Sequence, residues 1–418
     1  MQEAPVKVLL VGVDIGEEAD FEHSMEELAS LAEAAEKEVV GQIVQRLDHV
    51  NKALYIGTGK VAEVRRLAEE RGAQEVVFDN SLTPSQVRNL GKELELTVID
   101  RTNLILDIFA IRAQTREAKL QVETARLQYM LPRLVGMYDA LSRQGGASGS
   151  MSNKGTGEKK LELDRRKIEH RITELKKELE DVSRTRDVQR RKRQQSRTPQ
   201  VALVGYTNAG KSTILNRMVE QFGELPEKTV MEKDMLFATL ETSVRSIDTG
   251  HNKPFFLTDT VGFINKLPHH LVEAFKSTLE EAACSDIILK IADASDSEAA
   301  EQLSVTDEVL NDLGCGDIPQ VTVYNKCDRT GVAPYDPDVL LVSAKTGYGL
   351  DSLLAKIDEI LAHRVRTIEV LLPYDKLALA DVFRTRGSVL AEEYRENGVY
   401  YKATVKVDDL HRFEAYLL

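Results

Sequence analysis

The sequence predicts an α/β protein in which long helices separate two regions of alternating strands and helices. In residues 6–100 and 199–364, short β-branched runs alternate with amphipathic segments, which is typical of α/β domains. Between these regions, apolar residues recur at spacings of three and four, which indicates long helices. The chain has 418 residues, of which 42% are hydrophobic and 29% charged, so roughly three globular domains are expected.

The N-terminal region is expected to form an α/β domain with a parallel sheet. Thr83, Pro84 and Gln86 have the spacing of a capping box with proline at the first helical position. Strands are expected at 6–14, 39–47, 75–79 and 96–100, with helices at 24–37, 60–71 and 84–94.

Two apolar seams, at 120–141 and 161–182, predict a long antiparallel helical hairpin. The five glycines within 144–157 exclude a helix interior there and predict a flexible tip. Residues 159–197 hold 15 Lys or Arg and 8 Asp or Glu, whereas the whole chain has a net charge of −13. An acidic protein with one basic segment is expected to make one concentrated contact with an anionic partner.

The C-terminal end is expected to form a small α+β domain. Strands are expected at 367–372, 388–394 and 400–407, with helices near 376–384 and 410–418. The predicted domains are therefore an N-terminal α/β domain, a basic hairpin with its linker, a nucleotide-binding domain and this α+β domain. Their expected bounds are 1–113, 114–198, 199–364 and 365–418.

The composition also bears on the compartment of the protein. Cys284, Cys315 and Cys327 lack the paired spacing of a zinc site and exclude a disulfide scaffold, which favours reduced thiols in the cytoplasm. No stretch approaches the roughly 18 apolar residues that a membrane span needs. The apolar start is interpreted as a strand rather than a signal peptide.

Residues 205–212 carry the pattern G-x-x-x-x-G-K-[ST] between an expected strand and an expected helix. The glycines allow backbone N–H groups to surround phosphates, Lys211 neutralises the β- and γ-phosphates, and the Ser212 hydroxyl reaches Mg²⁺. The pattern predicts a nucleoside triphosphate site. By contrast, residues 56–60 lack the full spacing, and we interpret them as a helix N-terminus.

Three further motifs follow at the carboxyl ends of expected strands, where doubly wound sheets bind ligands. Residues 259–262 place Asp259 to hold Mg²⁺ through water and the Gly262 N–H to contact a γ-phosphate. In residues 325–328, the Asp328 carboxylate suits the N1–H and 2-amino donors of guanine, which adenine lacks. Residues 343–345 offer backbone N–H groups to guanine O6. Together they predict a P-loop GTPase domain rather than an ATPase or nucleoside kinase.

The expected roles follow from these motifs. Lys211, Thr239 and Gly262 are the candidate catalytic residues, and Mg²⁺ is expected on Ser212, Thr239 and Asp259, with Thr229 and Thr242 as rivals to Thr239. The residues expected to bind GTP or GDP are Gly205, Tyr206, Thr207, Asn208, Ala209, Gly210, Lys211, Ser212, Thr213, Phe237, Thr239, Asp259, Gly262, Asn325, Lys326, Asp328, Ser343, Ala344 and Lys345.

Phe263 follows Gly262 where many GTPases place a glutamine that orients the attacking water. A phenyl ring cannot hydrogen-bond water, so hydrolysis is expected to be slow until a partner supplies that role. The alternative is that Phe263 only packs in the switch.

These residues resemble the HflX family of bacterial translational GTPases, over nearly the whole chain. The resemblance lies in residues 55–60, 79–102, 121–136, 205–212, 237–240, 259–264 and 267–269. It implies a monomeric GTPase that binds the large ribosomal subunit through its N-terminal part and separates or rescues ribosomes under stress. Residues 154–162 read KGTGEKKLE where the family usually has RGPGETQLE, and Asn265-Lys266 stands where the family often has an arginine.

Asn208 occupies a position where several similar ribosome-linked GTPases place a potassium-coordinating asparagine, so K⁺ joins Mg²⁺ as an expected cofactor. The alternative is an asparagine that tolerates a turn conformation.

For the hairpin, contacts with rRNA phosphates are expected from Lys154, Lys159, Lys160, Arg165 and Arg166. The alternative is a solvated helix face. Two rival functions remain open, namely a GTPase of ribosome assembly or tRNA maturation, and a nucleotide-gated scaffold whose hydrolysis is incidental.

Overall fold

The computed structural model describes residues 4–16, 21–144, 154–195, 198–222, 236–237, 242–248, 254–264, 266, 280–330, 339–363, 365–385 and 387–418. The chain divides into two compact units. The first holds the N-terminal residues as far as Val182 and two short pieces around Phe237 and Lys266, and the second holds the remainder. Among the described residues, no helix combines the length and apolarity that crossing a membrane requires. The three cysteines are free thiols.

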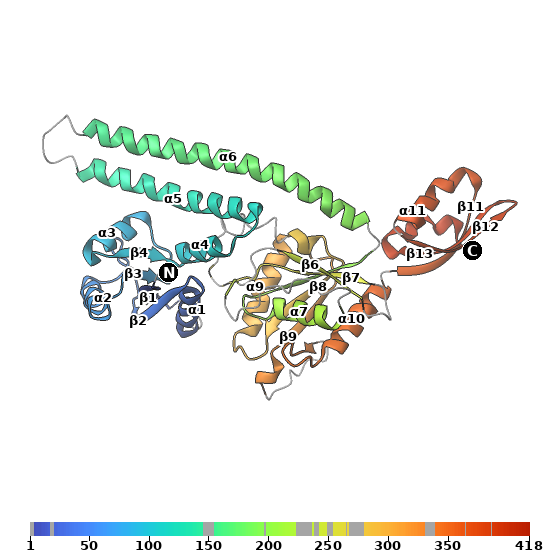
Figure 1. Ribbon diagram of the computed structural model, residues 1–418, viewed down its shortest axis with the longest axis horizontal. Helices are drawn as coiled ribbons and strands as arrows, with labels where there is room; N and C mark the ends of the chain where they lie inside the picture. Colours follow the sequence, from blue (N-terminus) through green and yellow to red (C-terminus); the bar gives the residue numbers. More distant parts are fainter. Residues whose placement is uncertain are drawn as a thin grey trace. The chain divides into compact units, whose positions relative to one another are not determined.

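The first unit contains a four-stranded parallel sheet in the order β2-β1-β3-β4, which confirms the predicted parallel arrangement (Figure 1). Its strands are β1 (Val6–Asp14), β2 (Lys37–Arg46), β3 (Glu75–Phe78) and β4 (Thr97–Asp100), and its helices are α1 (Phe21–Ala34), α2 (Thr58–Arg71), α3 (Pro84–Leu94) and α4 (Arg101–Arg112). The predicted capping box at Thr83 is present, and α2 begins directly after Gly57.

The first predicted helix was placed about three residues too late along the chain. Glu36 adopts a left-handed conformation with φ of 59°, which turns the backbone directly into β2 at Lys37. Helix α1 therefore ends at Ala34 rather than at Lys37.

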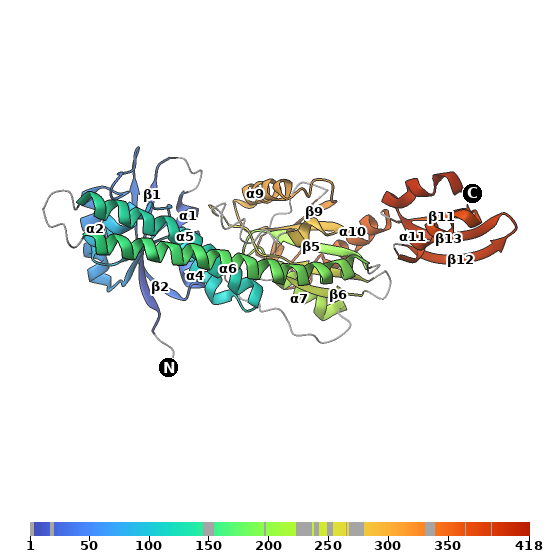
Figure 2. The same cartoon turned by 90° about the horizontal axis from the view of Figure 1, so that it is seen from above.

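Two long helices follow, α5 (Arg116–Gln144) and α6 (Lys154–Gln195). The prediction that 144–157 excludes a helix interior is wrong at its end, because α6 already includes Gly155 and Gly157. Arg171 pairs with Glu123 at 3.0 Å, and Arg116 pairs with Glu178 at 3.1 Å. The earlier residue of α5 thus pairs with the later residue of α6. The helices thus run in opposite directions as far as Val182, and Figure 2 shows them side by side. Ile172 and Leu175 of the second seam are buried, as helical spacing requires.

Asp100 ties helix α5 to the sheet. Its carboxylate is fully buried at the end of β4 and accepts hydrogen bonds from the Tyr129 hydroxyl at 2.5 Å and from Arg133 Nη2 at 2.8 Å. It also accepts from the backbone N–H groups of Leu82 and Asn103. Burial beside this carboxylate raises the pKa of Tyr129, so the phenol stays a proton donor. The Arg133 guanidinium lies 3.3 Å from the centre of the Tyr129 ring.

The second unit contains a six-stranded sheet in the order β10-β9-β8-β5-β7-β6, in which β6 alone is antiparallel to its neighbour. Its strands are β5 (Gln200–Gly205), β6 (Ser243–Ile247), β7 (Phe255–Asp259), β8 (Ile287–Asp293), β9 (Gln320–Asn325) and β10 (Leu340–Leu341). Helices α7 (Lys211–Phe222), α9 (Ala299–Asp312) and α10 (Leu350–His363) accompany it. The central strands are mainly apolar because both faces of a parallel sheet are covered.

The C-terminal part forms a three-stranded antiparallel sheet in the order β11-β13-β12, with strands β11 (Val365–Leu372), β12 (Ser388–Arg395) and β13 (Gly398–Lys406). Phe383 of helix α11 (Ala380–Thr385) stacks on Phe413 with ring centres 4.5 Å apart. The helix expected at 410–418 is wrong, because the chain forms 3₁₀ turns at Val407–Arg412 and Glu414–Tyr416. Leu417 bridges to Val370, which draws the chain end alongside β11 and prevents a longer helix.

Replacing Asp100 with alanine should lower the free energy of unfolding by about 3 kcal/mol, because Arg133, Tyr129 and two backbone N–H groups lose a buried acceptor. Urea unfolding followed by circular dichroism measures the change. The matched control is Glu70→Ala, whose side chain is 60% exposed and which should change stability by less than about 0.5 kcal/mol. Equal effects of the two variants would contradict the assigned role of Asp100.

Candidate nucleotide-binding site

The predicted phosphate loop lies between strand β5, which ends at Gly205, and helix α7, which begins at Lys211. The segment after β7 runs directly beside it. The Thr207 N–H donates to the Phe263 carbonyl at 2.7 Å, and the Phe263 N–H donates to the Gly205 carbonyl at 3.1 Å. The structure therefore brings the first two predicted motifs together at the carboxyl end of the sheet.

Two glycines of this loop are required by its geometry. Gly205 has φ of 149°, and a Cβ there would lie 2.1 Å from the Ile291 carbonyl oxygen. Gly210 has φ of 89°, and a Cβ there would lie 2.2 Å from Asn325 Nδ2. Asn208 is also left-handed, with φ of 61°, which agrees with an asparagine that tolerates a turn.

Lys211 is buried under the loop, where Nζ donates to the carbonyls of Tyr206 at 2.6 Å and Gly205 at 3.0 Å. Burial lowers the pKa of Lys211 to about 8, although the Asp259 carboxylate acts in the opposite direction. An anionic phosphate beside this ammonium would favour its charged form.

Oxygen atoms suited to Mg²⁺ converge beside the lysine. Ser212 Oγ donates to Asp259 Oδ2 at 2.6 Å, and the Asp259 side chain is buried at the end of β7. A hydroxyl and a carboxylate are the hard oxygen ligands that Mg²⁺ prefers. In addition, Thr207 Oγ1 is buried and makes no hydrogen bond to any other described residue, so a ligand oxygen would satisfy it. The residues present fit Mg²⁺ and a phosphate chain, and bound Mg²⁺ would neutralise charge on the phosphates.

Asn325 links the guanine-recognition motif to the phosphate loop. Its Nδ2 donates to the Ala209 carbonyl at 2.9 Å, and its Oδ1 accepts from the Ala344 N–H at 3.0 Å. The side chain therefore connects the two loops, and its expected role in binding GTP stays a prediction.

The third motif holds Asp328, the residue predicted to recognise the base. Ser343 Oγ donates to Asp328 Oδ1 at 2.6 Å. This hydrogen bond is the main cause that lowers the pKa of Asp328, which keeps the carboxylate ionised. Lys326 pairs with Asp293 at 2.8 Å. Sequence reasoning missed Asp293, although it ends an apolar strand at the same edge of the sheet.

Other predicted residues are placed less directly. Thr239 and Thr229 lie outside the described residues, and so do the side chains of Lys154, Lys159 and Lys160. Phe237 packs against Phe109 in the first unit, with ring centres 4.7 Å apart, so its role as a nucleotide ligand stays a prediction. On α6, Arg165 pairs with Glu169 and Arg166 with Glu162. Thr213 lies on α7, Thr242 precedes β6, and Lys345 is exposed.

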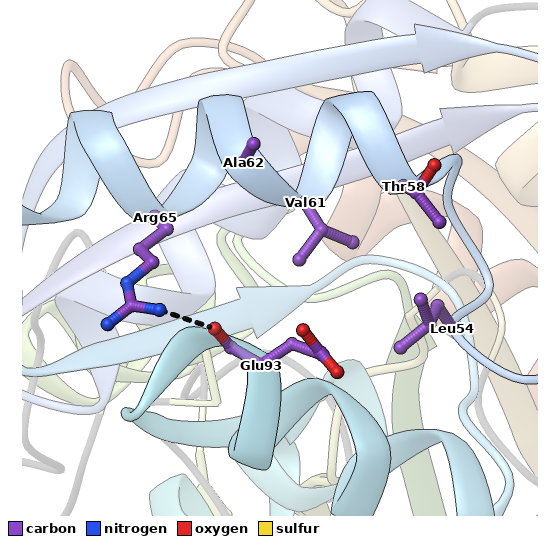
Figure 3. Close-up of a pocket in the computed structure, with 6 residues that line it drawn as sticks. All are labelled: Leu54, Thr58, Val61, Ala62, Arg65 and Glu93. Carbon is purple, nitrogen blue, oxygen red and sulfur yellow. Dashed lines mark hydrogen bonds between the residues drawn. The ribbon is translucent and has the colours of Figure 1, made fainter.

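A hollow of about 240 Å³ lies between α2 and α3 in the first unit (Figure 3). Arg65 at its edge donates to the Glu93 carbonyl and pairs with Glu69 and Glu95, so its charge is already balanced. Its lining residues are Leu54, Thr58, Val61, Ala62, Arg65 and Glu93. This hollow lacks the anion-binding geometry of the P-loop, which agrees with the interpretation of residues 56–60 as a helix start.

The site combines a strand, a phosphate loop and a helix with Asp259 beside Ser212. It also has an N-K-x-D motif that is hydrogen-bonded to the following loop. Together these features define a P-loop protein of the GTPase class. Three family models match the chain in succession: "GTP-binding GTPase N-terminal" over residues 22–110, "GTP-binding GTPase Middle Region" over 112–193 and "50S ribosome-binding GTPase" over 200–326. The chain belongs to the HflX family of GTPases, as its resemblance had implied, and it is a GTP hydrolase.

Similar proteins span nearly the same length. The chain is 44% identical to the GTPase HflX of Lacrimispora saccharolytica over 97% of this chain and 95% of that protein. It is 36% identical to the GTPase HflX of Escherichia coli, over 95% and 92% of the two chains. Among solved structures, a GTP-binding protein from Sulfolobus solfataricus in complex with GDP is 25% identical, with a TM-score of 0.46, and the match covers 85% of this chain and 99% of that one.

Asp328→Asn should weaken GTP binding by about 100-fold or more, because an amide N–H₂ would face the donors of guanine. Xanthosine triphosphate carries an acceptor at that position and should bind better than to the parent protein. Isothermal titration with both nucleotides measures the exchange of preference. Since Asp328 is exposed in the unliganded loop, the melting temperature serves as the folding control, and unchanged GTP affinity would remove Asp328 from the site.

Proposed function

We propose that this protein binds the large ribosomal subunit and, in its GTP-bound state, dissociates or rescues ribosomes under stress. The observation that supports this most directly is the match of residues 200–326 to a family model described as a 50S ribosome-binding GTPase. In the proposal, the protein acts as a monomer in the cytoplasm. Binding of GTP with Mg²⁺ produces the active state, and hydrolysis of GTP returns the protein to the inactive state.

In the proposal, helices α5 and α6 form one basic hairpin, at 114–198, whose tip contacts rRNA. Its phosphate contacts come from Lys154, Lys159, Lys160, Arg165 and Arg166. The two arginines are exposed and pair with glutamates one turn away on the same helix. Such i,i+4 pairs contribute only about 0.3–0.5 kcal/mol, so rRNA phosphates can displace the glutamates. The α+β domain at 365–418 completes the four-part arrangement.

The ribosome is proposed to supply the help in orienting the attacking water that Phe263 cannot give. Phe263 is 4% exposed, bridges to Tyr206 through the backbone and offers no polar side-chain atom next to Gly262. Thr239 is proposed to close over Mg²⁺. A potassium ion on Asn208 is proposed to offset the charge that develops between the β- and γ-phosphates.

The first test is GTP turnover by the purified protein alone, with 50S subunits and with 30S subunits, in potassium and in sodium buffers. We expect 50S subunits to raise turnover at least about tenfold, 30S subunits to have little effect, and sodium to lower the stimulated rate. No stimulation by 50S subunits would contradict the proposal and favour a nucleotide-gated scaffold. Equal rates in the two salts would contradict only the proposed role of the potassium ion.

A sucrose gradient of 70S ribosomes, mixed with the protein and a non-hydrolysable GTP analogue, separates the remaining alternatives. We expect free 50S and 30S subunits to accumulate, with the protein on the 50S peak. Intact 70S ribosomes together with preferential binding to precursor particles would favour a role in ribosome assembly.

Reversing two charges near the hairpin tip should weaken ribosome binding without affecting the nucleotide. We expect Lys159→Glu with Lys160→Glu to lower both 50S cosedimentation and stimulated turnover, because phosphate contacts become repulsive, and to leave GTP affinity and basal turnover unchanged. The matched control, Lys176→Glu with Lys177→Glu, makes the same charge change at exposed positions of the same helix. Equal losses in both double variants would indicate a general charge effect rather than docking through the tip.

A further inference from the structure

Asp293 ends the strand β8 at the edge of the sheet that carries the nucleotide site, yet it belongs to none of the four motifs there. The parallel pairing of β8 with β9 places Asp293 level with Asn325, the first residue of the guanine-recognition motif. Asp293 Oδ2 pairs with Nζ of the next residue, Lys326, at 2.8 Å. A carboxylate outside the motifs thus holds the side chain of a residue that is expected to bind GTP.

The two oxygens of Asp293 have separate partners. Oδ1 accepts from the backbone N–H of Ser295 at 2.9 Å and from Ser295 Oγ at 2.6 Å, which fixes the orientation of the carboxylate and turns Oδ2 towards Lys326. The side chains of Lys326 and Asp293 are only 14% and 16% exposed, so dissolved salt screens their ion pair weakly. The ammonium at the end of a flexible four-carbon chain is therefore held in one place.

The methylene groups of Lys326 extend from the base-recognition motif towards the phosphate loop. Lys326 Cε lies 4.0 Å from the position that a Cβ on Gly210 would take. Asp328, the expected ligand of the base, follows Lys326 by two residues. We expect a nucleotide that spans the phosphate loop and Asp328 to pass beside this side chain. A lysine whose charged end is held elsewhere offers the apolar surface of its methylene groups to such a ligand.

We propose that Asp293 is a positioning residue for nucleotide binding, which holds the Lys326 ammonium so that the methylene groups of Lys326 pack against the base. Ordering this side chain before the nucleotide arrives lowers the entropy that binding must remove. The inference rests on the expected role of Lys326 as a GTP ligand. Because the contact is with the base and not with the phosphates, Asp293 raises the affinity for GTP and for GDP by the same factor.

Asp293→Asn tests the proposal with little disturbance of the fold. The amide keeps one oxygen for the two Ser295 donors and places an N–H₂ group against the Lys326 ammonium. We expect GDP and a non-hydrolysable GTP analogue to dissociate about tenfold faster, with association rates changed less than about twofold. Stopped-flow fluorescence with labelled nucleotides, on the full chain with Mg²⁺, measures both rates. The melting temperature of the nucleotide-free protein should stay close to that of the parent.

A double-mutant cycle with Lys326→Met separates positioning from a structural role. We expect Lys326→Met alone to speed dissociation of both nucleotides by about tenfold, and the addition of Asp293→Asn to have no further effect. A further loss in the double variant would overturn the proposal, because Asp293 would then act through the fold rather than through Lys326. Parent rates in Lys326→Met would overturn it together with the expected role of Lys326. Parent rates in Asp293→Asn alone would overturn only the positioning role.

The matched control is Asp307→Asn, which makes the same change in another ion pair of strand β8. Asp307 pairs with Lys290 at 2.7 Å, and neither residue belongs to a nucleotide motif. This variant should therefore keep the parent rates. Equal losses in Asp307→Asn and Asp293→Asn would overturn the proposal, because they would indicate a general effect of charge removal. Faster dissociation of only one of the two nucleotides from Asp293→Asn would overturn it as well, because the base is common to both.

Discussion

The structure depends on buried carboxylates at the ends of parallel strands, each of which must find positive charge or hydrogen-bond donors. Asp79 directly follows β3, Asp100 ends the neighbouring strand β4, and Asp259 ends a strand of the second sheet. Each one recruits a chain segment distant in sequence. Asp100 recruits helix α5 through Tyr129 and Arg133, and Asp259 receives the hydroxyl of Ser212.

A parallel sheet produces this pattern because its strand ends converge at one edge, where the backbone N–H and C=O groups of the ladder come to an end. In the second unit, that edge is the nucleotide site. In the first unit, the described residues at the same kind of edge form no comparable glycine-rich loop, and the carboxylates there instead organise protein contacts. Carboxylates at the ends of parallel strands therefore lie at the nucleotide site in one sheet and form internal protein contacts in the other.

The sequence predicted those features whose signals are local. The spacing of Gly205, Gly210 and Lys211 defines a loop within eight residues, and Thr83 with Gln86 defines a helix start within four. The pairing of Lys266 with Asp79 could not be predicted, because 187 residues separate the two and neither stands in a periodic pattern. The 3₁₀ turns at the chain end were missed for the same reason, since a bridge between Leu417 and Val370 decides them.

The Asn325 side chain connects two loops that are predicted to contact the phosphates and the base of one nucleotide. Its amide donates to the Ala209 carbonyl and accepts from the Ala344 N–H, so it links the loop predicted to hold phosphates to the loop predicted to meet the base. The Asp328 carboxylate is held beside these loops by a hydrogen bond from the Ser343 hydroxyl. The bonds of Asn325 do not involve Asp328, so a substitution at position 328 would leave the link between the two loops in place.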